Sequence, residues 1–387
     1  MRGTTDSHSC TVSAAIAPRW REERSCLSAN TYEGLRRARR RIWTLSVEPE
    51  ATNGGEAAPS LWGWQTVASG LAAVGLLGFL ANTIDWRATW GEFLTSHKGL
   101  VLLGAACHYL TYPVRGARWR LCLDHLPVQQ AGAGFGLVVF FQNFVDNVVP
   151  AKLGDVYGAH LARINFGVRR SEAIGSIVFQ RMVDSWIVLL LSALASWSVL
   201  SHQLPAAIQW VLMGGCLIAV LCTALMVGFF ALDRTAPAWL PRKAADLISA
   251  FRKGMWPRRD TLAPILGYSA LIWVLETLWV FFLVRGFGIN PSPGEALFLT
   301  MVPLLATAFP LTPSGAGVVE LTLYSCLRLA GLDPTLAGSV TLLNRFLDYW
   351  CHIGAGIVIW LLRDRLKLQT WRESPRPAAG PADLWKA

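Results

Sequence analysis

Two copies of the pattern Arg-x-x-Asp lie inside apolar stretches, with Arg181 and Asp184 in the first copy and Arg345 and Asp348 in the second. On insertion scales a charged side chain at membrane depth costs roughly 2.5–3.5 kcal/mol, so each of these groups requires a partner or a watery cavity. Residues three apart share a helix face, so each arginine can pair with its own aspartate. An arginine also has spare donors that can reach a phosphate. The pattern therefore indicates either phosphate binding or an ion pair that only fixes helix packing.

Two other apolar regions are interrupted by proline and glycine, in "NFVDNVVPAKLGD" (143–155) and "FPLTPSGAGVVE" (309–320). Non-helical backbone at membrane depth is tolerated only where protein or a water-filled cavity surrounds it. The N-terminus of a half-helix also presents free N–H groups that suit a phosphate. The breaks therefore predict a cavity, although plain proline kinks would leave the same signal. The predicted break or hinge residues are Pro150, Gly154, Pro310, Pro313, Gly315 and Gly317.

Three charged residues lie next to these breaks. Lys152 and Asp155 flank the first break and are candidates for head-group binding, with a solvated loop as the alternative. Glu320 follows the second break, and we expect it in the first turns of a short helix, where the helix dipole favours a carboxylate. It could also carry a proton, since an intramembrane carboxylate can couple proton movement to substrate movement.

Other polar residues give weaker signals. Asn143 and Asp146, before the first break, are weaker candidates of the same kind. Glu276 lies in the middle of a predicted span, and both an arginine partner and exposure to the cavity are open for it. The lone His108 and His352 are interpreted as packing groups.

The composition indicates a membrane protein, with 53% hydrophobic and only 16% charged residues. The net charge of +10 comes from basic residues that we expect mainly in short loops between apolar runs, which argues against nucleic acid as a partner. The eight cysteines are scattered without a C-x-x-C pair. They predict neither a metal site nor a disulfide framework, and no cofactor is expected.

The predicted fold is an all-α polytopic membrane protein with about six full spans and two broken or re-entrant regions. The broken regions are 132–165 and 295–332. If each returns to the side that it entered, the arginine-rich loops near 115–120, 163–170 and 234–259 share one side with both termini. Both termini are therefore expected in the cytoplasm, in a cell inner membrane. The predicted spans are 62–84, 98–114, 173–200, 207–232, 261–285 and 336–362.

The sequence also predicts an inverted repeat. "GSIVFQRMVDSW" (175–186) aligns with "GSVTLLNRFLDYW" (338–350) with one residue inserted. Each half then contains an odd number of crossings, so the second copy is inverted, as in many transporters. The predicted domains are a basic, disordered cytoplasmic tail at 1–60, a membrane domain at 61–365 and a cytoplasmic tail at 366–387. The alternative for the first tail is a short amphipathic helix at "GLRRARRRIW" that lies on anionic head groups. The halves of the membrane domain are 61–200 and 207–362.

The motifs resemble a known family, the flippase-like transmembrane domain of lysylphosphatidylglycerol synthases and its stand-alone relatives. The sequence departs from the family pattern at Lys152, where arginine is usual, and at Tyr157, where a second arginine is common. No aminoacyl-transfer domain follows the last predicted span, so lysine transfer is not expected. The motifs that carry the resemblance are "RGARWRLCL" (115–123), "NFVDNVVPAKLGDVYGAHLAR" (143–163), "SIVFQRMVD" (176–184), "FPLTPSGAGVVE" (309–320) and "LNRFLDYW" (343–350).

The resemblance implies a lipid as the ligand, while the residues indicate a polar cavity with cations. We therefore expect a protein without enzymatic activity that binds an anionic phospholipid or a lipid-linked glycan by its head group and moves it between leaflets. One alternative is a membrane-embedded transferase acting on polyprenyl-linked sugars, which the short outer loops disfavour. Another is a non-transporting partner of a separate lipid-modifying enzyme or glycosyltransferase.

Overall fold

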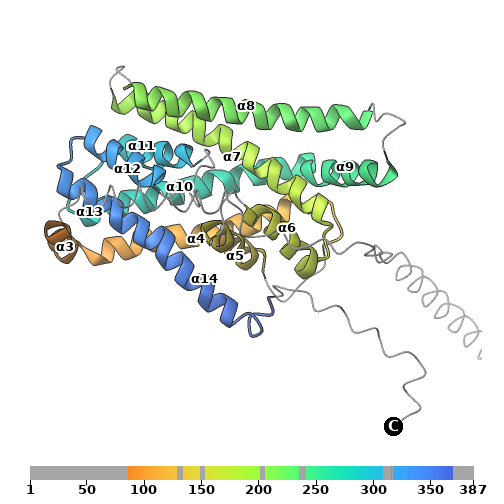
Figure 1. Ribbon diagram of the computed structural model, residues 1–387, viewed down its shortest axis with the longest axis horizontal. Helices are drawn as coiled ribbons and strands as arrows, with labels where there is room; N and C mark the ends of the chain where they lie inside the picture. The colour runs from red at the N-terminus through yellow and green to blue at the C-terminus, as the bar shows by residue number, and fades with distance from the viewer. Residues whose placement is uncertain are drawn as a thin grey trace, which may run out of the picture. The chain divides into compact units, whose positions relative to one another are not determined.

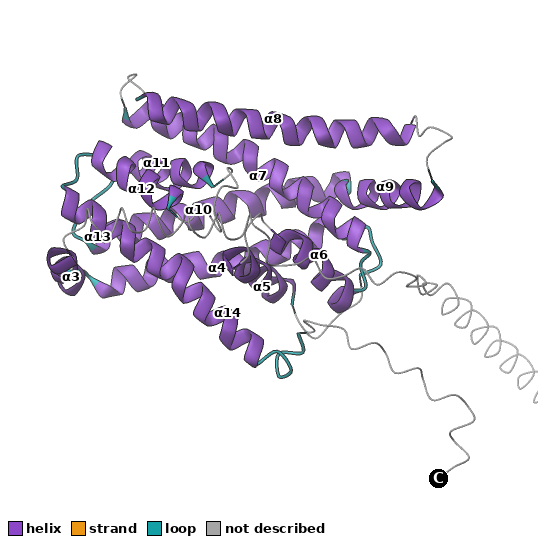
Figure 2. Ribbon diagram, in the orientation of Figure 1, coloured by secondary structure: helices purple, strands orange, loops and turns teal. Residues whose placement is uncertain are grey.

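A computed structural model of the chain describes residues 86–128, 134–148, 153–200, 205–234, 241–307, 315 and 317–368. The predicted span 62–84, the tail 1–60, residues 369–387, Lys152, Pro150, Pro310 and Pro313 lie outside these residues. Throughout the described part the secondary structure is helical, without strands (Figures 1 and 2). The helices are α3 (Trp86–Thr95), α4 (Lys98–Cys122), α5 (Phe135–Val148), α6 (Leu153–Phe166), α7 (Arg170–Val199), α8 (Ala206–Arg234), α9 (Arg242–Met255), η1 (Arg259–Thr261), α10 (Leu262–Gly286), α11 (Pro293–Ala306), α12 (Val318–Leu329), α13 (Pro334–Arg345), the π turn η3 (Phe346–Trp350) and α14 (Cys351–Leu361).

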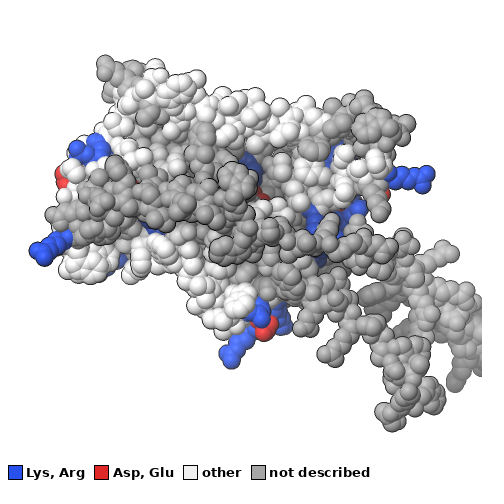
Figure 3. Space-filling model, viewed as in Figure 1, with Lys and Arg blue, Asp and Glu red and all other residues white. Residues whose placement is uncertain are grey.

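Three long helices confirm three of the predicted spans. They cover Arg170–Val199, Ile208–Gly228 and Arg259–Gly286, and each is long and apolar enough to cross a membrane. Even the shortest would extend roughly 30 Å at about 1.5 Å per residue. Large apolar side chains such as Leu190 and Leu217 are exposed on them, as lipid-facing residues are. Uncharged atoms cover most of the described surface in Figure 3.

Helix α4 is longer than predicted. It begins at Lys98, as expected, but continues to Cys122 instead of ending near residue 114. Arg115 and Arg118 therefore lie inside a helix and not in a basic loop, because each has a carboxylate partner on a neighbouring helix. These two arginines consequently give no support for the orientation of the chain.

The predicted span 336–362 is a composite helix. The Asp333 side chain accepts hydrogen bonds from the backbone N–H groups of Thr335 and Leu336, and Pro334 takes the first helical position. Helix α13 then passes through the π turn η3 into α14. A π turn inserts an extra residue into a helix and is frequent at functional sites.

Both broken regions form pairs of short helices, α5 with α6 and α11 with α12. None exceeds 14 residues, or roughly 21 Å at 1.5 Å per residue, against roughly 30 Å of hydrocarbon. The two helices of each pair pack against each other. Each broken region is therefore a helical hairpin and not one straight crossing.

Two of the predicted glycines have a clear role in these hairpins. Gly317 precedes α12 with φ of +84°, a conformation that glycine adopts without strain. The Gly154 amide donates to the Asp146 Oδ1 at 2.8 Å, and a Cβ on Gly154 would collide with that side chain. Close approach of α6 to α5 therefore depends on the absence of a side chain at position 154.

Part of the region expected as a loop at 234–259 is the amphipathic helix α9. Its Phe251 and Met255 pack into the core beside α7, while Arg242 and Lys253 are exposed. Apolar residues four apart give it a buried face, and this periodicity was not recognised in so basic a segment.

The packing of the long helices brings distant parts of the sequence together. Helix α4 lies along α10, α7 packs against α11, and α14 packs against α5 (Figure 1). Each of these contacts joins an element before residue 200 to one after residue 206. The hairpins and the Arg-x-x-Asp segments therefore meet in the middle of the described helices.

Candidate functional site

A cavity of about 310 Å³ lies between the helices of the two predicted halves. Arg181, Asp184, Arg345 and Asp348, the four residues of the repeated pattern, all line it. They come from α7, from the end of α13 and from η3. The cavity is thus where the sequence expected the intramembrane charges to meet, although their pairing differs from the prediction.

Arg181 pairs with Asp155, at the start of α6. The guanidinium donates two hydrogen bonds to that carboxylate, at 3.2 Å from Nε and 2.8 Å from a terminal nitrogen. Asp146 lies 3.7 Å from the same arginine, and Gln142 donates to Asp155 at 2.7 Å. The Arg181 side chain is 42% exposed. It therefore combines a carboxylate anchor with access to the cavity.

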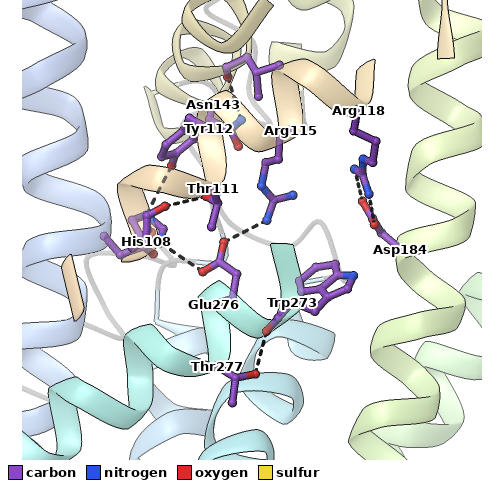
Figure 4. Close-up of polar contacts among 12 residues, drawn as sticks. His108, Thr111, Tyr112, Arg115, Arg118, Asn143, Asp184, Trp273, Glu276 and Thr277 are labelled. Carbon is purple, nitrogen blue, oxygen red and sulfur yellow. Dashed lines mark hydrogen bonds and ion pairs between the residues drawn. The ribbon is translucent and has the colours of Figure 1, made fainter. Parts of the chain in front are cut away.

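Asp184 pairs with Arg118 of α4. Two guanidinium nitrogens donate to its two oxygens at 2.6 and 2.8 Å (Figure 4). Arg118 also donates to the Ser269 hydroxyl at 2.9 Å. The alternative of an ion pair between Arg181 and Asp184 is therefore wrong. The Arg118 guanidinium, on a facing helix, forms two parallel hydrogen bonds with the Asp184 carboxylate, and this bidentate geometry is favourable. Sequence reasoning missed Arg118 because it was assigned to a loop.

Arg345 pairs with Glu320. Glu320 lies in the first turn of α12, which confirms its predicted position. The Arg345 Nε lies 2.7 Å from the Glu320 Oε1, and the two side chains are only 8% and 2% exposed. The other Glu320 oxygen accepts from the Gly317 N–H at 2.6 Å, and Tyr349 stacks on the guanidinium at 4.1 Å. The alternative of an ion pair between Arg345 and Asp348 is therefore also wrong.

The two arginine pairs repeat one arrangement. In each, a carboxylate in the first turn of the second hairpin helix meets an arginine of the span that follows. Asp155 corresponds to Glu320 and Arg181 to Arg345. Both arginines line the cavity, but the two copies differ in exposure, because the Arg181 side chain is 42% exposed and the Arg345 side chain is 8% exposed.

The fourth member of the pattern, Asp348, contacts His108 of α4. The distance from the His108 Nε2 to the Asp348 Oδ1 is 3.1 Å, and the Nδ1 lies 3.2 Å from the Glu276 Oε2. Arg115 donates to the other Glu276 oxygen at 3.0 Å (Figure 4). Glu276 thus has the arginine partner that the sequence left open. His108 is buried, as expected for a packing group, but its partners are two carboxylates, whereas His352 is buried in the aromatic core.

A signal for His108 was present in the sequence. His108 and Arg115 are seven residues apart, which places both on one face of α4. The face became recognisable only once the helix was known to continue beyond residue 114.

Two further candidates, Asn143 and Asp146 of α5, also line the cavity, as does Gly315. Among the described residues no group of three or more His, Cys, Asp or Glu is placed to hold a metal ion. The arrangement offers a cavity with charged residues in its lining, and Arg181 has the most exposed side chain of the described arginines that line it.

The sequence matches the family described as the lysylphosphatidylglycerol synthase TM region over residues 66–356. A UPF0104 membrane protein of Methanocaldococcus jannaschii is 27% identical over 57% of this chain and 95% of its own length. A second one of that organism is 21% identical over 70% of this chain and 87% of its own. One of Methanothermobacter thermautotrophicus is 21% identical over 67% and 82%. No solved structure matches. The chain is a multi-pass membrane protein that belongs to the lysylphosphatidylglycerol synthase TM region family.

Proposed function

We propose that the protein binds the head group of an anionic phospholipid or lipid-linked glycan in this cavity and moves it between leaflets. The observation that carries the proposal is a cavity at the meeting of both hairpins, lined by charged residues whose insertion into a membrane is costly. Charged residues within membrane helices are rare, and they mark substrate and ion pathways. The acyl chains would stay in the bilayer while the head group passes through the cavity.

Arg181 is the residue that we propose contacts the phosphate. Arg118 and Arg345 are nearly buried and hold carboxylates, and Arg115 is more enclosed than Arg181. Arg181 has the most exposed side chain among the described arginines that line the cavity, and phosphate is a strong acceptor for a guanidinium. Asp155 keeps its Gln142 hydrogen bond while the arginine turns to a ligand.

The proposed movement rests on inverted halves with alternating access. In support, both halves have a hairpin followed by a span that bears the arginine, and the two carboxylate–arginine pairs correspond. The Arg181–Asp155 pair is more exposed than the Arg345–Glu320 pair. This asymmetry is expected when the α5–α6 hairpin is in an open position and the α11–α12 hairpin in a closed one. In the opposite state we expect the exposures of the two pairs to exchange.

We further propose that both termini face the cytoplasm of a cell with an inner membrane. The support is the concentration of arginine in residues 163–170 and 234–259, on one side of the predicted spans. Single cysteines at positions 201 and 252, in a protein without other cysteines, test this. An impermeant maleimide applied to cells should label the first and spare the second. Labelling of both from the same side would contradict the inverted topology.

Lipid exchange in vesicles tests the proposed function. Purified protein is placed in vesicles of phosphatidylcholine and phosphatidylglycerol that contain a trace of fluorophore-labelled phosphatidylglycerol. We expect inner-leaflet label to reach an impermeant quencher faster than in protein-free vesicles, with all lipids chemically unchanged. A chemically altered lipid would indicate a membrane-embedded transferase instead. Neither exchange nor chemistry, with labelled phosphatidylglycerol or with a polyprenyl-linked sugar, would contradict the proposal and favour a non-transporting partner of another enzyme.

A further inference from the structure

We propose that His108, Glu276 and Asp348 form a binding site for a proton that is coupled to lipid movement. The inference deepens the proposed function and rests on it for the coupling, although the proton site itself stands on geometry. The three residues belong to α4, α10 and η3 and all line the cavity. No neighbouring residue separates either carboxylate from the imidazole ring.

The contacts fix how many protons the site holds. Each ring nitrogen of His108 lies within 3.2 Å of a carboxylate oxygen, which is an ion-pair distance, and the contact of the Nδ1 with Glu276 is also a hydrogen bond. A neutral imidazole carries only one N–H, whereas an imidazolium carries two. Tyr112 approaches the same Nε2 only to 3.5 Å and is the weaker partner. The imidazolium form is the one that offers an N–H to both carboxylates, and we infer it for His108.

The charges of the neighbouring residues favour the imidazolium form of His108. They also determine the net charge that remains when His108 loses a proton. With Arg115 and His108 positive and Glu276 and Asp348 negative, the group is neutral. Loss of one proton leaves a net charge of minus one inside the cavity, where an unbalanced charge is costly. The other titratable or charged groups around His108 and Asp348 are Tyr109, Tyr112, Arg345 and His352, with Asp146, Arg181 and Asp184 across the cavity.

Asp348 gives the proton its path to the cavity. Its side chain is 37% exposed, whereas that of His108 is 8% exposed. A proton that leaves the His108 Nε2 is therefore accepted by the Asp348 carboxylate and passes to cavity water. Glu276, held by Arg115, stays ionised as the fixed end of the site.

The site also joins parts of the structure that must separate in alternating access. Asp348 lies in the π turn, whose Leu347 carbonyl accepts from the Tyr109 hydroxyl of α4 at 2.9 Å. Tyr349 of the same turn donates to the Asn147 carbonyl of α5 at 2.9 Å. Of these three contacts of the π turn with α4 and α5, the His108–Asp348 contact is the charged one. Its loss would therefore weaken the attachment of α4 to the π turn.

A metal ion does not fit this group. Glu276 and Asp348 contact opposite nitrogens of one ring, so their oxygens do not converge on a common point. Each histidine nitrogen that a metal would need is already engaged by a carboxylate.

The proton site is tested directly by NMR of nitrogen-labelled histidine in the full protein. The His108 signal is the one that disappears in His108→Gln. We expect it to show two protonated ring nitrogens in acidic buffer and to lose one proton as the pH rises, at a lower pH in Asp348→Asn than in wild type. A neutral His108 over the whole range, or a titration that Asp348→Asn does not move, would overturn the site. This measurement does not depend on transport.

The coupling is tested by the rate of labelled phosphatidylglycerol exchange in acidic and alkaline buffer. We expect the wild-type rate to change at least about fivefold between the two, the lower end of typical coupling between sites. His108→Gln and the isosteric Asp348→Asn should lose this dependence, while His97→Gln, an exposed position just before α4, should keep it. A pH dependence that survives in both cavity variants would overturn the coupling. If the wild-type protein exchanged no lipid at any pH, the proposed function would be contradicted. The NMR measurement would still test the proton site, because it does not depend on transport.

Discussion

Replacing Arg345 with methionine is expected to lower the free energy of unfolding by about 3–5 kcal/mol, the cost of leaving a buried charge without its partner. Glu320 is almost fully buried and would lose the guanidinium that lies 2.7 Å away. Thermal and denaturant unfolding in detergent measure the loss. Arg258→Met is the matched control, because its pair with Asp260 is exposed and such pairs contribute little.

The double replacement Arg345→Met with Glu320→Gln is expected to recover most of that stability. Glutamine carries no charge, and its carbonyl can still accept from the Gly317 N–H that begins α12. Wild-type stability of Arg345→Met alone would contradict the pairing. If Arg345→Met with Asp348→Asn recovered the stability and Arg345→Met with Glu320→Gln did not, the partner of Arg345 would be Asp348 and not Glu320.

Replacing Arg181 with glutamine is expected to slow lipid exchange by roughly 10- to 150-fold. This range corresponds to the loss of a hydrogen bond to a charged group, about 1.5–3 kcal/mol. Stability should change much less, because Arg181 is partly exposed and Asp155 keeps the hydrogen bond from Gln142. Exchange of labelled phosphatidylglycerol, beside unfolding in detergent, measures both effects.

Two controls separate a phosphate contact from general damage. Arg258→Gln removes an equally charged group outside the cavity and should exchange lipid at the wild-type rate. Arg181→Lys keeps the positive charge but loses the paired donors, so an intermediate rate is expected. An Arg181→Gln protein that exchanges lipid as fast as the wild type would remove Arg181 from the proposed path.

The sequence predicted the places where the helices break, and it singled out the four charged residues of the repeated pattern, which line the cavity. Proline and glycine beside charged residues mark the hairpin of α5 and α6 as clearly as that of α11 and α12, since local backbone chemistry decides a break. The position of Glu320 in the first turn of α12 follows from the same local rules.

The partners of those charges were not predictable from spacing. Asp184 has Arg181 three residues away, yet it pairs with Arg118 on a helix 66 positions away in sequence. Likewise Asp348 contacts His108 and not Arg345. Such choices depend on the packing of α4 against its neighbours, which a single sequence does not specify. The length of α4 was underestimated for the same reason, because basic residues look like a loop until their acceptors are known.

Photochemical crosslinking of a lipid tests the central claim, that a head group enters the cavity. Purified protein is illuminated in vesicles with phosphatidylglycerol that carries the photoreactive group on its glycerol head, and crosslinked peptides are identified by mass spectrometry. The account predicts crosslinks to the cavity faces of α5, α7 and η3, reduced in Arg181→Gln, while a group at the end of an acyl chain should label the lipid-facing side of α8. Head-group crosslinks confined to the outer surface of the helices, and unchanged in Arg181→Gln, would contradict it.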